Sequence, residues 1–515
     1  MFPVTSQLDE ALQIVAHLRA AGYEAYLAGG CVRDLLLGRE PKDYDVATSA
    51  TPDVVLAMFP RTFAVGAHFG VVLVASEVES QTAGPEGPRS TEIVTEVATF
   101  RSDGAYSDGR HPDAVKYTRS AEEDVRRRDF TINGLLLDPF KLFPQEPRPD
   151  RMAESDPQAE QAADRAGFVS GHDFSRAATS AKTLRALDPD ACLSANSSQM
   201  RAAVLDHVNG LSDLDAGVVR AIGQLELRFE EDHLRMLRGV RFAARFDFEL
   251  DPGTASAMRR LAAKTKAVSR ERVRDELTKM LTEGHARRAF ELLDATGLLA
   301  EVLPEVARMK GVEQPPQFHP EGDVWTHTLL LLGQLAAGCS PTLAWGALLH
   351  DVGKPPTFRR AERIRFDGHV EVGVAMGAEI CRHFRFSNDE SRQILALIEN
   401  HMRFADAQRM KASTLKRFFR LENFPEHLAL HRMDCLASSV GLDHWEFVRE
   451  RFETIPEEAV RPLPLITGRE LIAAGYKPGA GFKQMLHAVE DAQLEGLIET
   501  AEQALGLVRD RFPII

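Results

Sequence analysis

The sequence predicts an α+β head built on a mixed sheet, followed by an all-α neck or body and a second all-α domain. In the first 140 residues, short β-rich apolar segments alternate with glycine turns and short helical patterns. Beyond residue 204, apolar residues recur mostly at helical spacing. A chain of 515 residues is also too long for one hydrophobic core. We therefore expect several domains.

The domain boundaries follow from shifts in composition along the chain. We expect the head at 1–140, a helical neck and body at 204–310, the second all-α domain at 311–460 and a helical tail at 461–515. Residues 141–203 are rich in Pro, Ala, Gln, Ser and mixed charges, as in EPRPDRMAESDPQAEQAADRAG. Such a segment buries too little apolar surface to order itself, so we predict a disordered insertion and assign it no function.

Composition excludes several classes of protein. The net charge of −14 argues against nonspecific nucleic-acid binding, although basic residues cluster locally. No apolar run reaches membrane-spanning length and the N-terminus lacks a basic signal region, so we expect neither membrane insertion nor secretion. The five cysteines form no C-x-x-C pair, which argues against a disulfide framework or a thiolate zinc site and fits a reducing cytoplasm. They are Cys31, Cys192, Cys339, Cys381 and Cys435.

The head is organised around residues 26–48, YLAGGCVRDLLLGREPKDYDVAT. The pattern is that of a short apolar strand, a turn at Gly29 and Gly30, a short helix, and a second strand that begins Asp43-Tyr44-Asp45. Because strand side chains alternate, we expect Asp43 and Asp45 on one face, about 6–7 Å apart. Neighbouring carboxylates repel each other unless a cation lies between them, and hard oxygen ligands suit Mg²⁺.

The glycines beside this acidic pair indicate the chemistry in which the cation would take part. Gly29 and Gly30 allow the backbone to approach a ligand closely, and the N–H groups that open the following helix can bind phosphate. A phosphate site beside a Mg²⁺-binding carboxylate pair is suited to the transfer of a nucleotidyl group. Glu96, on a strand predicted at 93–101, is either a third carboxylate of this site or an exposed strand residue.

Several connecting segments of the head have turn chemistry. Phe63–Ala75 is predicted to form a hairpin that turns near Ala67 and His68, and residues 80–90 a Gly/Pro/Ser loop. Tyr106–Pro112, YSDGRHP, predicts a mobile loop beside the site, in which His111 is interpreted as a loop residue rather than a ligand.

The order of strand, G-G, V-R-D helix, Gly and D-x-D strand resembles the head of the class II tRNA nucleotidyltransferase and bacterial poly(A) polymerase family, within the polymerase-β-like superfamily. The resemblance implies that Gly29, Gly30 and Arg33 belong to the nucleotide site. It continues at 122–138, EEDVRRRDFTINGLLLD, which resembles the block that holds the incoming nucleotide. Arginine clusters suit phosphate binding, although a solvated face is their usual fate.

Within that block the resemblance assigns individual residues. Arg128 is expected on the phosphates, and Asp129 and Asn133 are expected to brace the sugar and the neighbouring loop. Members of the family usually cross the gap at 141–203 in a short turn, so the insertion departs from the family pattern.

Residues 230–248, EEDHLRMLRGVRFAARFDF, predict one amphipathic helix with Asp232, Arg235, Arg238 and Arg241 at three-residue spacing. A basic solvated face is one interpretation. The other is chemical: a carboxylate beside a guanidinium accepts from the amino group of cytosine or adenine and leaves groups unpaired against uracil or guanine. The segment resembles the family's amino-acid template, which implies that Asp232 and Arg235 read the base and that Arg238 and Arg241 support the triphosphate or the base edge.

Two further segments carry weaker signals. Lysines and arginines between Met258 and Arg288 form either a solvated face or a stripe that follows the phosphates of a tRNA acceptor arm. Residues 465–494, with TGRELIAAGYKPGAGF, resemble the end of family members and predict a helix–turn–helix closure.

Histidines and aspartates on apolar helices predict a second site. They are His327, His350, Asp351, His369, His401 and Asp434. Neutral imidazoles and carboxylates can share one or two divalent ions, with Mn²⁺, Ni²⁺, Mg²⁺ or Fe²⁺ favoured over structural Zn²⁺, and such a site generates hydroxide for phosphoryl displacement. The order H…HD…H…H…D resembles the HD-superfamily phosphohydrolases.

What this second resemblance implies is a second enzymatic activity. The same tandem arrangement occurs in bacterial CCA-adding enzymes, where the HD part resembles a 2′,3′-cyclic phosphodiesterase and 2′-nucleotidase. Lys354 is expected near a substrate phosphate.

The sequence therefore predicts a cytoplasmic tRNA nucleotidyltransferase that adds C, C and A to tRNA 3′ ends from CTP and ATP and releases pyrophosphate, with Mg²⁺ on Asp43 and Asp45. Poly(A) polymerase and A-adding or CC-adding enzymes are the alternatives, although VGAHFGVVLV lacks the G-R-R-F that poly(A) polymerases tend to carry. Alternatives from other classes are a metal phosphohydrolase with an inactive head and an RNA-binding scaffold. No protein partner is inferred.

Overall fold

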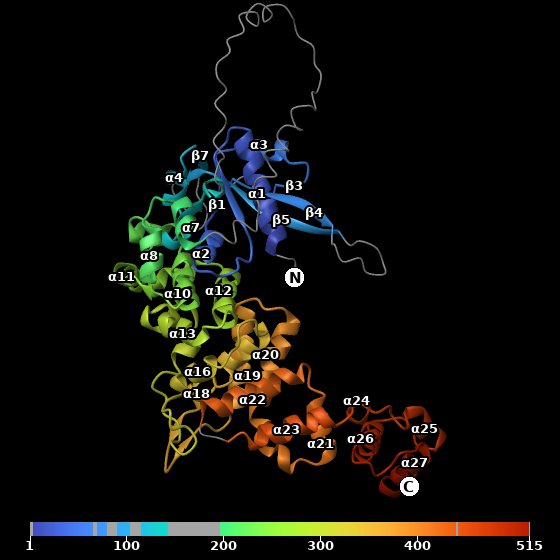
Figure 1. Cartoon of the computed structure of the whole chain (residues 1–515). Coiled ribbons are helices and arrows are strands. Elements are labelled where there is room, and N and C mark those ends of the chain that lie inside the picture. Colours follow the sequence, from blue (N-terminus) through green and yellow to red (C-terminus); the bar gives the residue numbers. More distant parts are fainter. Residues whose placement is uncertain are drawn as a thin grey trace, which may run out of the picture. The chain divides into compact units, whose positions relative to one another are not determined.

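The computed structural model describes residues 4–64, 70–79, 90–103, 115–142, 196–438 and 441–513 (Figure 1). The chain forms two compact units, Met1–Ala267 and Val268–Ile515. The first combines a mixed sheet with helices, and the described part of the second is helical except for one short hairpin. The predicted α+β head followed by all-α domains is confirmed. The predicted turn at 67–68, most of the loop at 80–90, the loop at 106–112 and Cys192 lie outside the described residues.

The head is built on a seven-stranded sheet with the order β3-β4-β5-β2-β1-β8-β9. Strands β2 and β5 are parallel, and the other neighbours are antiparallel. Two shorter pairs, β6 with β7 and β10 with β11, lie outside it. The strands of the first unit are β1 Ala25–Ala28, β2 Asp45–Thr48, β3 Thr62–Phe63, β4 Val71–Glu79, β5 Ser90–Thr99, β6 Arg101–Asp103, β7 Val115–Tyr117, β8 Leu135–Leu137, β9 Val204–Asp206, β10 Val218–Val219 and β11 Glu249–Leu250.

The helices of the first unit cover this sheet and extend away from it (Figure 1). Leu8, Leu12 and Val15 recur at helical spacing and are fully buried, because their helix, α1, packs on β1, β2 and β5. The α-helices are α1 Val4–Ala20, α2 Gly30–Leu36, α3 Pro52–Met58, α4 Ala121–Arg126, α7 Ser197–Ala203, α8 Gly210–Ala216, α9 Leu225–Glu231, α10 Leu234–Phe246 and α11 Pro252–Leu261, with 3₁₀ turns η2 Thr131–Asn133, η3 Pro139–Lys141 and η4 Ala262–Ala267.

Two element boundaries near the acidic pair and the template differ from the prediction. Strand β2 begins at Asp45, so Asp43 precedes the strand instead of lying in it. The single helix predicted at 230–248 is two helices, because Asp232 is extended (φ −147°) and ends α9. Its Oδ1 accepts a hydrogen bond from the amide of Leu234, the first residue of α10, at 3.0 Å.

The predicted disordered insertion at 141–203 is wrong at its C-terminal end, and residues 143–195 lie outside the described part. Ser197–Ala203 forms α7, which opens with a reciprocal capping box between Asn196 and Gln199. Strand β9 then pairs with β8, so the first residues of the predicted neck belong to the head sheet. The segment orders because Met200 and Ala203 are buried.

The second unit is helical and has apolar clusters within residues 404–460 and 466–508. Helix α17 packs against α12, α20 and α22. The helices are α12 Arg270–Thr282, α13 Ala286–Ala295, α14 Leu298–Val302, α15 Pro304–Ala307, α16 Val324–Leu332, α17 Pro341–Leu349, α18 Lys354–Thr357, α19 His369–His383, α20 Asn388–Asn400, η5 His401–Arg409, α21 Ala412–Phe419, α22 Phe424–Ala437, α23 Asp443–Thr454, α24 Glu457–Val460, α25 Gly468–Ala473, α26 Gly481–Leu494 and α27 Ala501–Arg511, and the hairpin pairs β12 Arg359–Arg360 with β13 Ile364–Arg365.

One buried histidine of this unit makes its stability depend on pH. His427 is 1% exposed, and burial lowers its pKa to about 4. The folded state therefore favours the neutral ring, and the stabilisation present above the unfolded pKa near 6.5 is lost as the pH falls towards 4. His427→Phe should make the loss of unfolding free energy between pH 7.5 and 4.5 smaller by about 2–3 kcal/mol.

Tryptophan fluorescence during chemical denaturation measures this unit selectively, because the three tryptophans, Trp325, Trp345 and Trp445, all belong to it. His487→Phe is the matched control, since that side chain is 59% exposed. Equal acid sensitivity in wild type and His427→Phe would show that this ring does not titrate as described.

Candidate functional site

A pocket of about 610 Å³ in the first unit is lined by every residue that the sequence assigned to the nucleotidyl site. These residues come from four stretches of the chain, which are the β1–β2 region, the strand β5, the 127–133 block, and Asp232 with the following helix α10. They are Gly29, Gly30, Arg33, Asp43, Asp45, Glu96, Arg128, Asn133, Asp232, Arg235, Arg238 and Arg241. The acidic pair and the predicted base-reading couple therefore share one cavity.

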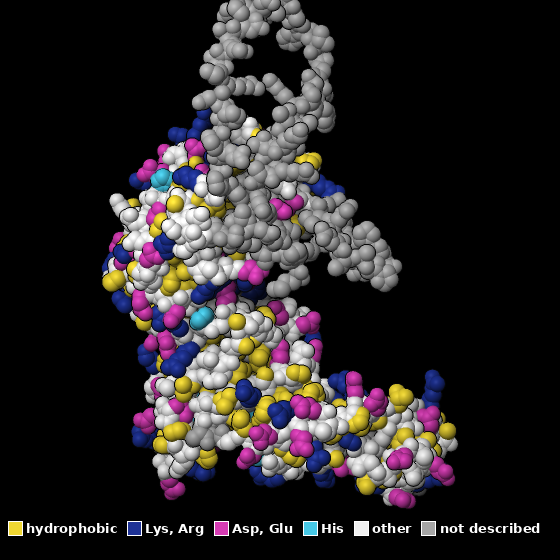
Figure 2. Space-filling model, viewed as in Figure 1, with side chains coloured by type: hydrophobic (Ala, Val, Ile, Leu, Met, Phe, Trp, Pro, Cys, Tyr) yellow, Lys and Arg dark blue, Asp and Glu magenta, His cyan; other side chains and the backbone are white. Residues whose placement is uncertain are grey.

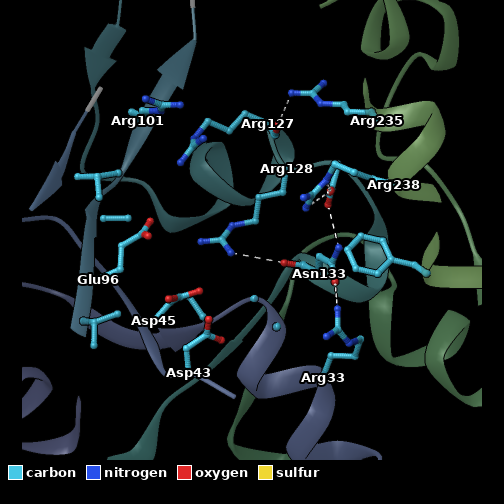
Figure 3. A pocket seen from close by; sticks show the side chains of 18 of the residues that line it. Arg33, Asp43, Asp45, Glu96, Arg101, Arg127, Arg128, Asn133, Arg235 and Arg238 are labelled. Carbon is cyan, nitrogen blue, oxygen red and sulfur yellow. Dashed lines mark hydrogen bonds and ion pairs between the residues drawn. The ribbon is translucent and has the colours of Figure 1, made fainter. Parts of the chain in front are cut away.

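Three carboxylates face one another on one side of this pocket. Figure 3 shows Asp43, Asp45 and Glu96 pointing into the same space, with Arg128 across from them. Burial, followed by the charges of Glu96 and Asp43, raises the pKa of Asp45 to about 7. Burial and Asp43 also raise the pKa of Glu96. Crowded, partly dehydrated carboxylate oxygens that resist ionisation are a donor set that fits Mg²⁺.

The Gly-Gly turn brings backbone close to Arg128. Gly29 has φ +73°, and a Cβ atom there would lie 3.0 Å from Nη1 of Arg128. The same guanidinium donates to the backbone oxygen of Asn133 at 3.4 Å. Only glycine combines this backbone angle with room for the arginine.

Asp124, which sequence reasoning did not single out, anchors the arginine block. It lies 1% exposed on α4 and pairs with Arg127 at 2.8 Å and with Arg128 at 3.1 Å. Although burial opposes the shift, these two arginines lower the pKa of Asp124. The i,i+3 and i,i+4 spacing within E-E-D-V-R-R-R was the available signal.

A chain of hydrogen bonds along one wall of the pocket joins the glycine-turn helix to α10. Nη1 of Arg33 donates to Oδ1 of Asn133 at 2.5 Å, and Nδ2 of Asn133 donates to Oδ1 of Asp129 at 2.9 Å. Nε of Arg238 donates to Oδ2 of Asp129 at 2.9 Å. Against the effect of burial, Arg238 and Asn133 lower the pKa of Asp129 to about 2. The network fixes the side chains that line this wall.

Arg235 is held in place by protein partners. Its Nη1 donates to Oε2 of Glu231 at 2.6 Å, and Glu231 also accepts from Nη1 of Arg228 at 2.6 Å. Nη2 of Arg235 lies 3.4 Å from the backbone oxygen of Arg127, as Figure 3 shows. Glu231 and Arg228, which sequence reasoning missed, therefore help to tie the start of α10 to the arginine block.

The predicted HD residues also come together, in the second unit around Asp351. Nε2 atoms of His350, His369 and His401 lie 3.2, 3.9 and 3.8 Å from its carboxylate oxygens. Nε2 of His327 lies 4.0 Å from Asp351 and 3.1 Å from Oδ1 of Asp434. The fold allows this convergence because the histidines stand at helix ends or on helices that pack together.

The hydrogen bonds of three rings show which nitrogen is available. Nδ1 of His350, His369 and His401 lies 2.8, 3.0 and 2.7 Å from a backbone oxygen three residues earlier. A carbonyl only accepts, so Nδ1 carries the proton and Nε2 keeps its lone pair. These buried Nε2 atoms have no hydrogen-bond partner. Burial also lowers the pKa of His401 to about 4, so this ring is neutral and fits a divalent metal.

Two carboxylates of this centre are strongly acidic. Despite burial, the Lys354 ammonium helps to hold the pKa of Asp351 well below its usual range, and His327 lowers that of Asp434. Against the effect of burial, Asp434 and Glu321 raise the pKa of His327 to about 9. Sequence reasoning missed Glu321, which accepts from Nδ1 of His327 at 2.9 Å.

Lys354 was expected near a substrate phosphate. In the structure it is 8% exposed, and its Nζ lies 2.7 Å from Oδ2 of Asp351 and 2.7 Å from Oε1 of Gln314. Both of these Lys354 contacts are with protein side chains. The contact between Lys354 and a substrate phosphate stays a prediction.

Three protein-family models match successive parts of the chain. Residues 25–144 match the poly A polymerase head domain, residues 247–310 a probable RNA and SrmB-binding site of polymerase A, and residues 324–438 the HD domain. A CCA-adding enzyme of Streptococcus thermophilus is 28% identical over 97% of this chain and 96% of the relative. One of Lactobacillus johnsonii is 32% identical over 62% of this chain and 63% of the relative.

A solved structure supports the fold. The CCA-adding enzyme of Bacillus stearothermophilus, in complex with CTP, superposes with a TM-score of 0.64 at 24% identity, over 99% of this chain and 98% of that chain. The mixed-sheet head, the following helical segment and the HD domain define a nucleotidyltransferase with a second, HD-type unit. The chain belongs to the family of class II tRNA nucleotidyltransferases and bacterial poly(A) polymerases.

The surface is mixed in charge. On the face that Figure 2 shows, acidic and basic side chains are interspersed over both units. None of the helices in the described ranges combines the length and apolar character that a membrane crossing needs.

Proposed function

We propose that the head adds C, C and A to the 3′ end of tRNA from CTP and ATP, with release of pyrophosphate. The observation that carries the proposal is the single pocket in which Asp43, Asp45 and Glu96 lie with Asp232 and Arg235. Relatives that match nearly the whole chain are named CCA-adding enzymes, which supports this activity over other members of the family.

Within the proposal, each wall of the pocket has one task. Asp43 and Asp45, with Glu96 beside them, would hold Mg²⁺, which when bound supplies Lewis-acid stabilisation of the triphosphate and favours ionisation of the 3′-hydroxyl. Arg128, fixed by Asp124, lies across the cavity from these carboxylates (Figure 3) and suits the phosphate oxygens.

The base would be read at the start of α10. The carboxylate of Asp232 can accept from the amino group of cytosine or adenine, and Arg235 can donate to the neighbouring ring nitrogen. Uracil and guanine present the opposite pattern, and each group left unpaired would cost about 1–3 kcal/mol. Because Glu231 and the Arg127 carbonyl hold Arg235, the reading groups are positioned before a nucleotide arrives.

Single-nucleotide extension assays separate the members of the family. We expect tRNA that lacks CCA to be extended with CTP alone by two residues, tRNA ending in CC to accept one AMP, and a poly(A) primer to remain unextended. Long adenosine tracts on either substrate would identify a poly(A) polymerase instead. Extension restricted to one of the two nucleotides would identify an A-adding or CC-adding enzyme.

Asp232→Asn should weaken base selection. The amide keeps an oxygen to accept from the Leu234 backbone amide but presents a donor to the base, which suits uracil O4 better than the amino group of cytosine. We expect the preference for CTP over UTP to fall at least about tenfold, measured as kcat/KM with tRNA that lacks CCA. Glu230→Gln changes an exposed neighbour and should leave the preference intact. An unchanged preference in Asp232→Asn would remove this residue from the template.

We propose a second activity, metal-dependent hydrolysis of ribonucleotide phosphate esters, for the HD centre. The unpartnered Nε2 atoms around Asp351 favour it, because imidazole lone pairs and a carboxylate are ligands for Mn²⁺, Ni²⁺, Fe²⁺ or Mg²⁺. Such an ion, when bound, supplies hydroxide at neutral pH. Release of phosphate from 2′,3′-cyclic AMP or 2′-AMP, dependent on one of these metals, tests the activity. A metal-loaded protein that releases none would refute it.

A further inference from the structure

A second pocket adjoins the HD centre without containing any of its predicted ligands. It measures about 770 Å³ and lies between residues 311–323 and the β12–β13 hairpin. Gln314 and His319 line it, and both touch the centre. Oε1 of Gln314 accepts from Lys354, which also pairs with Asp351. The ring of His319 stands edge-on to that of His327, with the centroids 4.9 Å apart.

Gln314 has a buried donor with no partner. The residue is 2% exposed. An ammonium group only donates, so the amide atom facing Lys354 must be the oxygen, and the NH₂ group faces elsewhere. Nε2 makes no hydrogen bond to any described residue. An unpaired buried donor costs about 1–3 kcal/mol, so a ligand that supplies an acceptor would bind here favourably.

The position of the pocket indicates the chemistry of that ligand. A volume near 770 Å³ is in the range that holds a nucleotide-sized molecule. Arg360 and Arg363 line the hairpin side, where Glu313 and Glu362 offset their charge. The pocket therefore has no excess positive charge that would attract any anion. Selective binding of a phosphoryl oxygen would need a hydrogen-bond donor next to the metal centre, such as Nε2 of Gln314.

We propose that this pocket binds the ribonucleotide substrate of the HD centre and that Gln314 donates from Nε2 to a non-bridging phosphoryl oxygen. The inference rests on the proposed hydrolase function and deepens it. Gln314 is then a substrate-binding residue, and the metal ligands are separate from it.

Binding of inorganic phosphate to the Mn²⁺-loaded full chain tests the assignment by calorimetry. Gln314→Glu replaces the donor with a charged oxygen of the same shape, and Gln314→Met removes the amide at similar volume. Both should weaken phosphate binding at least about tenfold with an unchanged Mn²⁺ content, and raise KM for 2′,3′-cyclic AMP more than they lower kcat. Gln334→Glu, exposed and outside the pocket, should bind phosphate as the wild type does.

Chemical denaturation followed by tryptophan fluorescence confirms that each variant is folded, because all three tryptophans belong to the unit that holds this pocket. The assignment is overturned if wild type binds no phosphate, or if both Gln314 variants bind it with wild-type affinity. Binding that depends on Gln314 in a protein that hydrolyses no phosphate ester would support the pocket and refute the hydrolase proposal alone.

Discussion

Asp45→Asn should lower nucleotide incorporation into tRNA about a thousandfold, equivalent to about 4 kcal/mol of transition-state stabilisation. The substitution keeps the shape of the side chain and removes one charged oxygen from the group that Asp43 and Glu96 complete. Incorporation of radiolabelled CMP into tRNA that lacks CCA, measured at saturating Mg²⁺, gives the rate.

Because the pKa of Asp45 is raised, a stability measurement can tell the loss of a metal ligand from the loss of the folded structure. Burial and the neighbouring carboxylates raise it to about 7, so the stabilisation present when the group is protonated is lost as the pH rises through 7. A permanently neutral asparagine should therefore leave the metal-free protein at least as stable at pH 8. Asp53→Asn alters an exposed aspartate of the head and should retain activity. Substantial incorporation by folded Asp45→Asn would contradict the metal assignment.

Asp351→Asn should abolish both metal retention and phosphate-ester hydrolysis in the second unit. Its carboxylate is the common neighbour of His350, His369 and His401, and the amide has no charge to hold a divalent ion among them. The amide oxygen can still accept from Lys354, so that buried ammonium keeps a partner. Metal content by mass spectrometry and phosphate release from 2′,3′-cyclic AMP are the two measurements.

The exposed Asp389, with 85% of its side chain accessible, provides the control, and Asp389→Asn should retain metal and hydrolysis. CMP incorporation should survive in Asp351→Asn, because the two sites lie in separate units. A variant that keeps its metal but loses hydrolysis would move Asp351 from the ligand set to another role.

The residues that the structure brings together in the two candidate sites could be predicted from the sequence, because their side-chain types suit metal and phosphate binding. Asp43, Asp45 and Glu96 can bind a hard cation wherever the fold brings them together, and the order of motifs along the chain indicated that it would. The histidines of the second site were found in the same way, by residue type on apolar helices.

The supporting residues depend on tertiary contacts that no local pattern encodes. Glu231 and Arg228 look like any charged pair on a helix. Only the structure shows that Arg228 donates to backbone oxygens of the arginine block and that Glu231 accepts from both Arg228 and Arg235. Glu321 and Gln314 lie in a Pro-rich segment without periodicity. The sequence did not predict the helix break at Asp232, because the apolar spacing continues through it. The hydrogen bond from the Leu234 amide to the Asp232 side chain stabilises the extended backbone there.

The sequence also did not predict strand β9. Three residues, Val204–Asp206, are too short a segment to distinguish from a helix entry by spacing. They join the sheet because the edge of β8 pairs with them.

A structure of the chain with CTP and Mg²⁺ bound tests the central claim most directly. We expect the triphosphate between Arg128 and the carboxylates of Asp43 and Asp45, with the amino group of cytosine within hydrogen-bonding distance of Asp232. A triphosphate bound there with its base out of reach of Asp232 and Arg235 would contradict the account.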